Sequence, residues 1–78
     1  MEVKPGDIIV IDGVRYVFGE GSAKATNLWL VALEKGVPEE HSKIHLFRVG
    51  MTEGGSFSPS EIKEALERAN FNKTRHGL

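Results

Sequence analysis

The chain has 78 residues, a net charge of −1 at neutral pH and no cysteine. This length suits a single domain, residues 1–78, and the lack of cysteine excludes disulfides and thiolate metal sites. The charge argues against a protein that binds polyanions through its bulk charge, and no apolar run approaches the ~20 residues of a membrane-spanning helix. The first residues lack a basic stretch followed by an apolar one, so we expect no signal peptide, no membrane partner and a cytoplasmic location.

The first predicted element is a β-hairpin centred on Asp12-Gly13. Runs of β-branched and aromatic residues at 7–11 and 14–18 flank this dipeptide, which is the strongest short-range signal for a two-residue turn. Such a turn fixes the register of the two strands. It places four pairs opposite each other: Ile11 and Val14, Val10 and Arg15, Ile9 and Tyr16, and Ile8 and Val17.

Both faces of this hairpin are apolar. One face carries Ile9, Ile11, Val14, Tyr16 and Phe18, and the other carries Ile8, Val10 and Val17 with Arg15. A sheet that is apolar on both sides must be covered on both sides. We therefore expect one face to line the interior, and the other to be covered by a helix or by another molecule.

Three segments separate the hairpin from the C-terminal part. Residues 19–26 are mostly small and show no periodicity, so we expect a loop there. Residues 27–33 are continuously apolar and favour a buried strand, although periodicity alone leaves a short helix open. Another strand is expected at 43–49, and Gly54-Gly55 then breaks the sheet, so all strands fall within residues 7–50.

A single helix is predicted at about residues 59–70. Ser58 and Glu61 have the spacing of a capping box, and Pro59 occupies the first helical position. An apolar stripe with helical spacing follows, at Ile62, Ala65, Leu66 and Ala69. Residues 71–78 are expected to form a frayed tail.

The stretch from Pro5 to Gly13, Pro-Gly-Asp-Ile-Ile-Val-Ile-Asp-Gly, resembles the opening of KOW-type and related SH3-like small barrels. The resemblance implies a non-catalytic barrel that contacts RNA, DNA or a protein of the transcription or translation machinery. With the predicted elements, it gives a mainly β fold with one C-terminal α-helix. That fold is a small, bent, antiparallel SH3-like barrel of four to five strands, capped by the helix.

Catalytic and metal sites are not indicated. No serine stands in a nucleophile motif, and no pair of carboxylates suggests a tuned acid and base. His41 and His45 have a helical metal-ligand spacing, but four residues of a strand span about 13 Å, too far for one ion. We therefore expect no enzyme activity, no metal and no cofactor.

The surplus of apolar strand surface predicts a non-enzymatic protein-interaction module, such as a small regulator or inhibitor of a larger machine. The candidate partner-binding residues are Ile8, Val10, Arg15, Val17, Trp29 and Phe47, although Trp29 also suits core packing. The alternative is nucleic-acid binding by the barrel, with Lys24, Lys43, Arg48, Lys73 and Arg75 on phosphates. A homodimer that buries the second apolar face is a third hypothesis.

Overall fold

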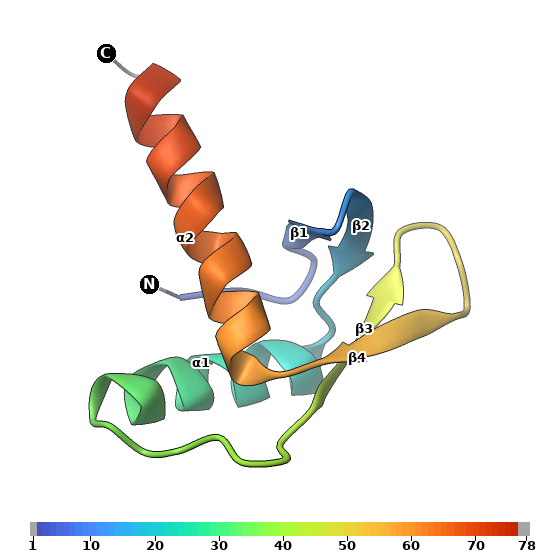
Figure 1. The fold of residues 1–78 in the computed structure, drawn as a ribbon. Coiled ribbons are helices and arrows are strands. Elements are labelled where there is room, and N and C mark those ends of the chain that lie inside the picture. Colours follow the sequence, from blue (N-terminus) through green and yellow to red (C-terminus); the bar gives the residue numbers. More distant parts are fainter. Residues whose placement is uncertain (1, 77–78) are drawn as a thin grey trace.

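The computed structural model describes the main chain of residues 2–76 and the side chains of residues 2–69. Figure 1 shows a sheet beside two helices. The elements in chain order are β1 (Ile8–Ile11), β2 (Val14–Val17), α1 (Glu20–Glu34), β3 (Ile44–Arg48), β4 (Gly54–Phe57) and α2 (Pro59–His76). The four strands are all antiparallel to their neighbours and lie in the order β1-β2-β3-β4.

The first hairpin is confirmed with its predicted register. Ile11 lies opposite Val14, and the three other predicted pairs follow it along the strands. Asp12 and Gly13 have φ angles of 52° and 77°, the left-handed conformation that a two-residue turn of this kind requires. The turn residues therefore decide which side chains of β1 and β2 share a face.

Three expectations about the architecture are wrong. Gly54 and Gly55 do not break the sheet but begin the strand β4, so the strands extend beyond residues 7–50. Residues 20–34 form the helix α1, where a loop and a strand at 27–33 were expected, so the described chain has two helices. The sheet is open, with β1 and β4 as its edges, and does not close into a barrel. The fold is thus mixed α+β, and α2 continues to His76, beyond the end expected near residue 70.

The helix α1 forms because its residues bury a stripe with helical spacing. Ala23, Thr26 and Leu30 are buried, at positions i, i+3 and i+7. At its start, the Gly19 N–H donates to the Ser22 hydroxyl over 2.8 Å. At its end, Gly36 adopts a φ of +82°, and the N–H groups after Lys35 return to the last carbonyls of the helix in a Schellman arrangement.

The interior lies between the two helices and one face of the sheet. The core cluster joins Ile9 and Ile11 of β1 to Ile44 and Leu46 of β3, under Ala23, Ile62 and Ala65 of the helices. Tyr16 and Phe57 extend it with an edge-to-face contact, with ring centroids 4.8 Å apart. We call this covered side of the sheet the inner face.

The N-terminal segment is fastened to α1 through one side chain. The Asn27 amide accepts from the Val3 N–H and donates to the Val3 carbonyl, both over 2.8 Å, so it acts as a short strand partner. Val3 is buried as a result. These two hydrogen bonds hold the N-terminal segment against α1.

At the other end of the sheet, Gly54 lies very close to the main chain of β3. A Cβ atom added there would overlap the carbonyl oxygen of Leu46, so only glycine fits without moving a strand. The backbone of β4 is thereby drawn against β3, and its first residues present almost no side chain.

Candidate interaction surface

The side of the sheet opposite the inner face has no element over it in the described chain. The register places Ile8 beside Val17, Val17 beside Phe47, and Val10 beside Arg15 on this side. Ile8, Val10 and Phe47 are exposed by 49%, 52% and 48%, and Val17 is half-buried. We call Ile8, Val10, Val17 and Phe47 the open-face patch, and Arg15 lies at its margin beside Val10.

An open face of this composition is unusual. An antiparallel sheet with one solvated face normally alternates apolar residues inward and polar residues outward. Here β1 reads Ile-Ile-Val-Ile and is apolar in both directions. Two helices suffice for the inner face alone, so the apolar side chains of the open-face patch remain in contact with solvent.

The margin of the patch is mixed. The His45 ring meets Phe47 edge to face, with centroids 5.0 Å apart, and Val49 is exposed just beyond β3. Arg15 is exposed and makes no ion pair with any described residue. The patch and its margin thus combine an apolar centre with an imidazole and a guanidinium at the edge.

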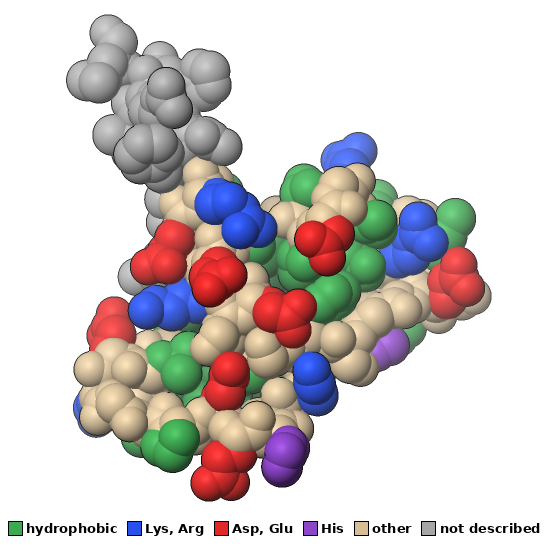
Figure 2. All heavy atoms as spheres, in the orientation of Figure 1, with side chains coloured by type: hydrophobic (Ala, Val, Ile, Leu, Met, Phe, Trp, Pro, Cys, Tyr) green, Lys and Arg blue, Asp and Glu red, His purple; other side chains and the backbone are tan. Residues whose placement is uncertain are grey.

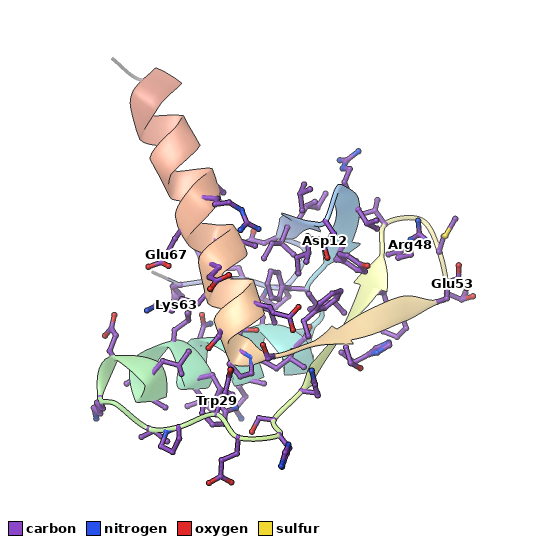
Figure 3. All side chains as sticks on the ribbon, viewed as in Figure 1. Asp12, Trp29, Arg48, Glu53, Lys63 and Glu67 are labelled. Atoms are coloured by element: carbon purple, nitrogen blue, oxygen red, sulfur yellow. The ribbon has the colours of Figure 1, made fainter. Side chains whose placement is uncertain are left out.

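Of the six predicted partner-binding residues, five therefore come together on the open face. Trp29 does not join them, because it belongs to α1 and packs, partly buried, against the core cluster. Figure 3 shows Trp29 at α1, away from Asp12 in the turn of the β1–β2 hairpin. Its alternative interpretation as a packing residue agrees with this placement.

The helix that the sequence analysis missed carries a second exposed apolar area. Leu28 of α1 is exposed by 65%, and Val31 beside it is also exposed. Together with Val3 and Pro5 they line a shallow depression of about 490 Å³, with Glu20 and Lys24 at its rim. The sequence signal that could have predicted this helix is the helical spacing of residues 23–31, which gives one buried and one exposed stripe.

The cations proposed for nucleic-acid binding are distributed over separate elements. Lys24 lies on α1, Lys43 precedes β3 and is close enough to Glu61 to affect its titration, and Arg48 pairs with Glu53 over 3.9 Å. Figure 3 shows that last pair at the far tip of the β3–β4 hairpin. Lys73 and Arg75 have side chains outside the described residues.

Among the described residues, Glu61 has a carboxyl pKa below its ordinary value, and the cause is the helix cap. The Ser58 N–H donates to Glu61 Oε1 over 3.1 Å, which holds the pKa of that carboxyl below its ordinary value. The Ser58 hydroxyl accepts from the Glu61 N–H over 3.2 Å, so the predicted capping box is confirmed. The perturbed group thus belongs to the helix start and not to the open face.

Two further kinds of site would bear on function in the described part of the chain, a metal cluster and a membrane-spanning helix. No group of three or more His, Asp or Glu residues within it is placed to hold a metal ion. Neither described helix combines the length and the apolarity that a bilayer crossing needs. The open-face patch is thus the feature of this structure that most needs an explanation.

Comparison with known proteins adds no relative: no family model, no curated protein and no solved structure matches this chain.

Proposed function

We propose that the protein is a non-enzymatic interaction module that docks another protein on the open-face patch, as a small regulator or inhibitor of a larger assembly. The observation that supports the proposal is the exposure of Ile8, Val10 and Phe47, each about half accessible on one uncovered sheet face. Covering the remaining half of each such side chain contributes roughly 1 kcal/mol. Four neighbouring side chains then supply the apolar centre of an interface.

The size of the patch sets the kind of partner. A stable interface covers about 800 Å² on each side, more than one small sheet face provides. The partner therefore extends past the patch onto its polar margin, where Arg15 and His45 lie. A partner with an apolar ridge and an acidic group near Arg15 fits this surface best.

Affinity capture from host lysate tests the proposal. The immobilised chain is compared with Val10→Ser/Val17→Ser and with a matched control, Leu28→Ser/Val37→Ser, which also removes exposed apolar side chains but leaves the sheet intact. We expect proteins retained by the native chain and by the control to be depleted at least tenfold by the open-face variant, since ~1.4 kcal/mol corresponds to tenfold in affinity. Circular dichroism verifies that both variants fold. Equal retention by a folded open-face variant contradicts the proposal.

Nucleic-acid binding, the alternative, is addressed by its salt dependence. A protein that contacts phosphates loses affinity by about one unit of log-log slope per contact as salt rises. The three described cations offered for that role each lie near an acidic side chain or on a separate element. We therefore expect no mobility shift of a 30-nucleotide RNA or DNA at low salt; a salt-sensitive shift would favour the alternative.

A further inference from the structure

The edge strand β1 presents free main-chain groups. The Phe18 N–H donates to the Asp7 carbonyl over 3.0 Å, so residues 7 and 18 form a hydrogen-bonded pair. Such pairs alternate along an antiparallel ladder, and Ile9 and Ile11 therefore bond to β2 while Ile8 and Val10 do not. The N–H and C=O groups of Ile8 and Val10 point away from the sheet, and no described residue bonds to them.

A groove runs beside this edge. It has a volume of about 570 Å³ and lies between the hairpin and α2. Its walls are Ile8, Ile9 and Val10 on one side and Ala65, Leu66 and Ala69 on the other. Figure 2 shows hydrophobic side chains gathered at the hairpin, facing α2 across this space. The small alanines leave room where larger residues would close the groove.

Two charged residues of opposite sign line the groove. Arg68 lines it from α2 and Asp12 from the tip of the hairpin, and neither forms an ion pair with a described residue. Arg68 is also exposed. An acidic side chain of a bound segment would find an unpaired guanidinium here, and a basic one would find Asp12 at the opposite wall.

The two edge strands of the sheet, β1 and β4, differ in how well they suit pairing with a new strand. β1 reads Ile-Ile-Val-Ile and contains no proline, charge or bulge that would discourage pairing with a new strand. β4 reads Gly-Gly-Ser-Phe and offers few side chains for a new strand to pack against. An added strand thus gains apolar contacts at β1 on both of its faces, and few at β4.

We propose that β1 receives an extended segment of the partner as a fifth strand. The segment bonds to the main chain of Ile8 and Val10. It places alternate side chains into the groove on Ala65 and Ala69, and an acidic residue near Arg68. This inference rests on the proposed function, because it names the form of protein segment that docks. The volume of the groove lies within the ~300–1,000 Å³ of pockets that hold a ligand.

An extended peptide fits this edge better than a second copy of the chain does. β1 has four residues and is therefore about 13 Å long, which gives too little contact for a stable dimer by pairing of the two edges alone. A peptide needs no such area, since it fills the groove with its own side chains. A dimer formed through paired β1 edges would therefore overturn the assignment of β1 to a partner peptide.

Selection of peptides provides the probe. The full chain is panned against a random 12-residue peptide library displayed on phage, and the most enriched peptide is synthesised with a fluorophore. Binding is measured by anisotropy. We expect enriched sequences to alternate β-branched and aromatic residues and to include an acidic residue, and Arg68→Glu to weaken their binding several-fold.

Two pairs of variants separate the edge from the open face. Val10→Pro removes the N–H at the edge and should weaken the peptide at least tenfold, whereas Val10→Thr keeps the N–H and the branched shape and should stay within about threefold. Ala69→Trp fills the groove from an exposed helix position and should also weaken binding at least tenfold, even if Val10→Pro fails to fold. Phe47→Ser lies two strands away and should leave peptide binding unchanged.

The results that overturn the inference differ from those that overturn the proposed function. No enriched peptide, or peptide binding that survives both Val10→Pro and Ala69→Trp, overturns strand addition at β1. A dimer in sedimentation that Val10→Pro dissolves overturns it in favour of a second copy. If strand addition fails in either way, but Phe47→Ser lowers capture of the protein partner at least tenfold, the docking role of the open-face patch stands without strand addition.

Discussion

The two faces of the sheet have similar composition and opposite environments. Leu46 on the inner face has no exposed area, whereas Phe47, the next residue, is exposed by 48% on the open face. The difference comes from α1 and α2, which both pack on the inner face and leave the other uncovered. The register of the strands therefore shows which residues share a face, but the packing of the helices decides which face becomes core.

The largest expected effect contrasts those two adjacent residues. Leu46→Ala should lower the free energy of unfolding by about 2–5 kcal/mol, because it leaves a cavity among fully buried side chains. Phe47→Ala should cost less than about 1 kcal/mol, since half of its ring already meets solvent. Urea unfolding followed by circular dichroism measures both. Equal losses would mean that the open face is covered in solution.

A second prediction concerns a polar group in the inner layer. The Thr26 hydroxyl of α1 is buried and has no hydrogen-bond partner among the described residues. Thr26→Val keeps the shape and removes the unpaired group, so it should raise the free energy of unfolding by about 1 kcal/mol. Thr26→Ser, which keeps the hydroxyl and removes a methyl group, is the control and should destabilise. A loss with Val in place of Thr would show that the hydroxyl is satisfied.

The cap of α2 gives a third prediction, with a pH dependence. Ser58→Ala should lower the free energy of unfolding by about 1 kcal/mol through the loss of the hydroxyl acceptor. Glu61 has a lowered pKa in the fold, so its contribution is present above the unfolded pKa and is lost as pH falls through the folded one. The free energy of unfolding should accordingly fall more between pH 6 and pH 3 for the native chain than for Glu61→Gln. An identical difference for both proteins would remove the role of this carboxylate.

The smallest expected effect lies at the tip of the second hairpin. Arg48 and Glu53 are 3.9 Å apart and both are largely exposed. Glu53→Gln should change the free energy of unfolding by less than about 0.5 kcal/mol, because solvent and salt screen such pairs. Differential scanning calorimetry of both proteins at low and high salt would measure this change and its screening by salt. A loss above 1 kcal/mol would indicate that this pair, and not the register of β3 and β4, holds the hairpin.

The sequence predicted the parts of the fold that depend on local chemistry. Asp12-Gly13 determined the first hairpin and its register, and Ser58 with Glu61 determined the start of α2. These features follow from the conformational limits of two or four residues. The same register placed Ile8, Val10, Arg15 and Val17 on one face of the hairpin, whereas the position of Phe47 on that face depends on the pairing of β2 with β3.

The sequence misled where tertiary packing decides. Residues 20–26 include Gly21 and Thr26, which have modest helix propensity, and the apolar residues after them suit a strand as well as a helix. Burial of Ala23, Thr26 and Leu30 on one stripe selects the helix. Because α1 and α2 together cover the inner face, the sheet does not need to close into a barrel to bury it. Trp29, which was expected in a strand, lies in α1.

The most direct test of the docking surface is site-specific photo-crosslinking. A benzophenone amino acid is placed at Phe47, or at Val37 as a control of similar exposure outside the sheet. Irradiation in host cells should yield a discrete crosslinked protein from position 47 and none from position 37. The same products from both positions, or products from position 37 alone, would contradict an interface on the open-face patch.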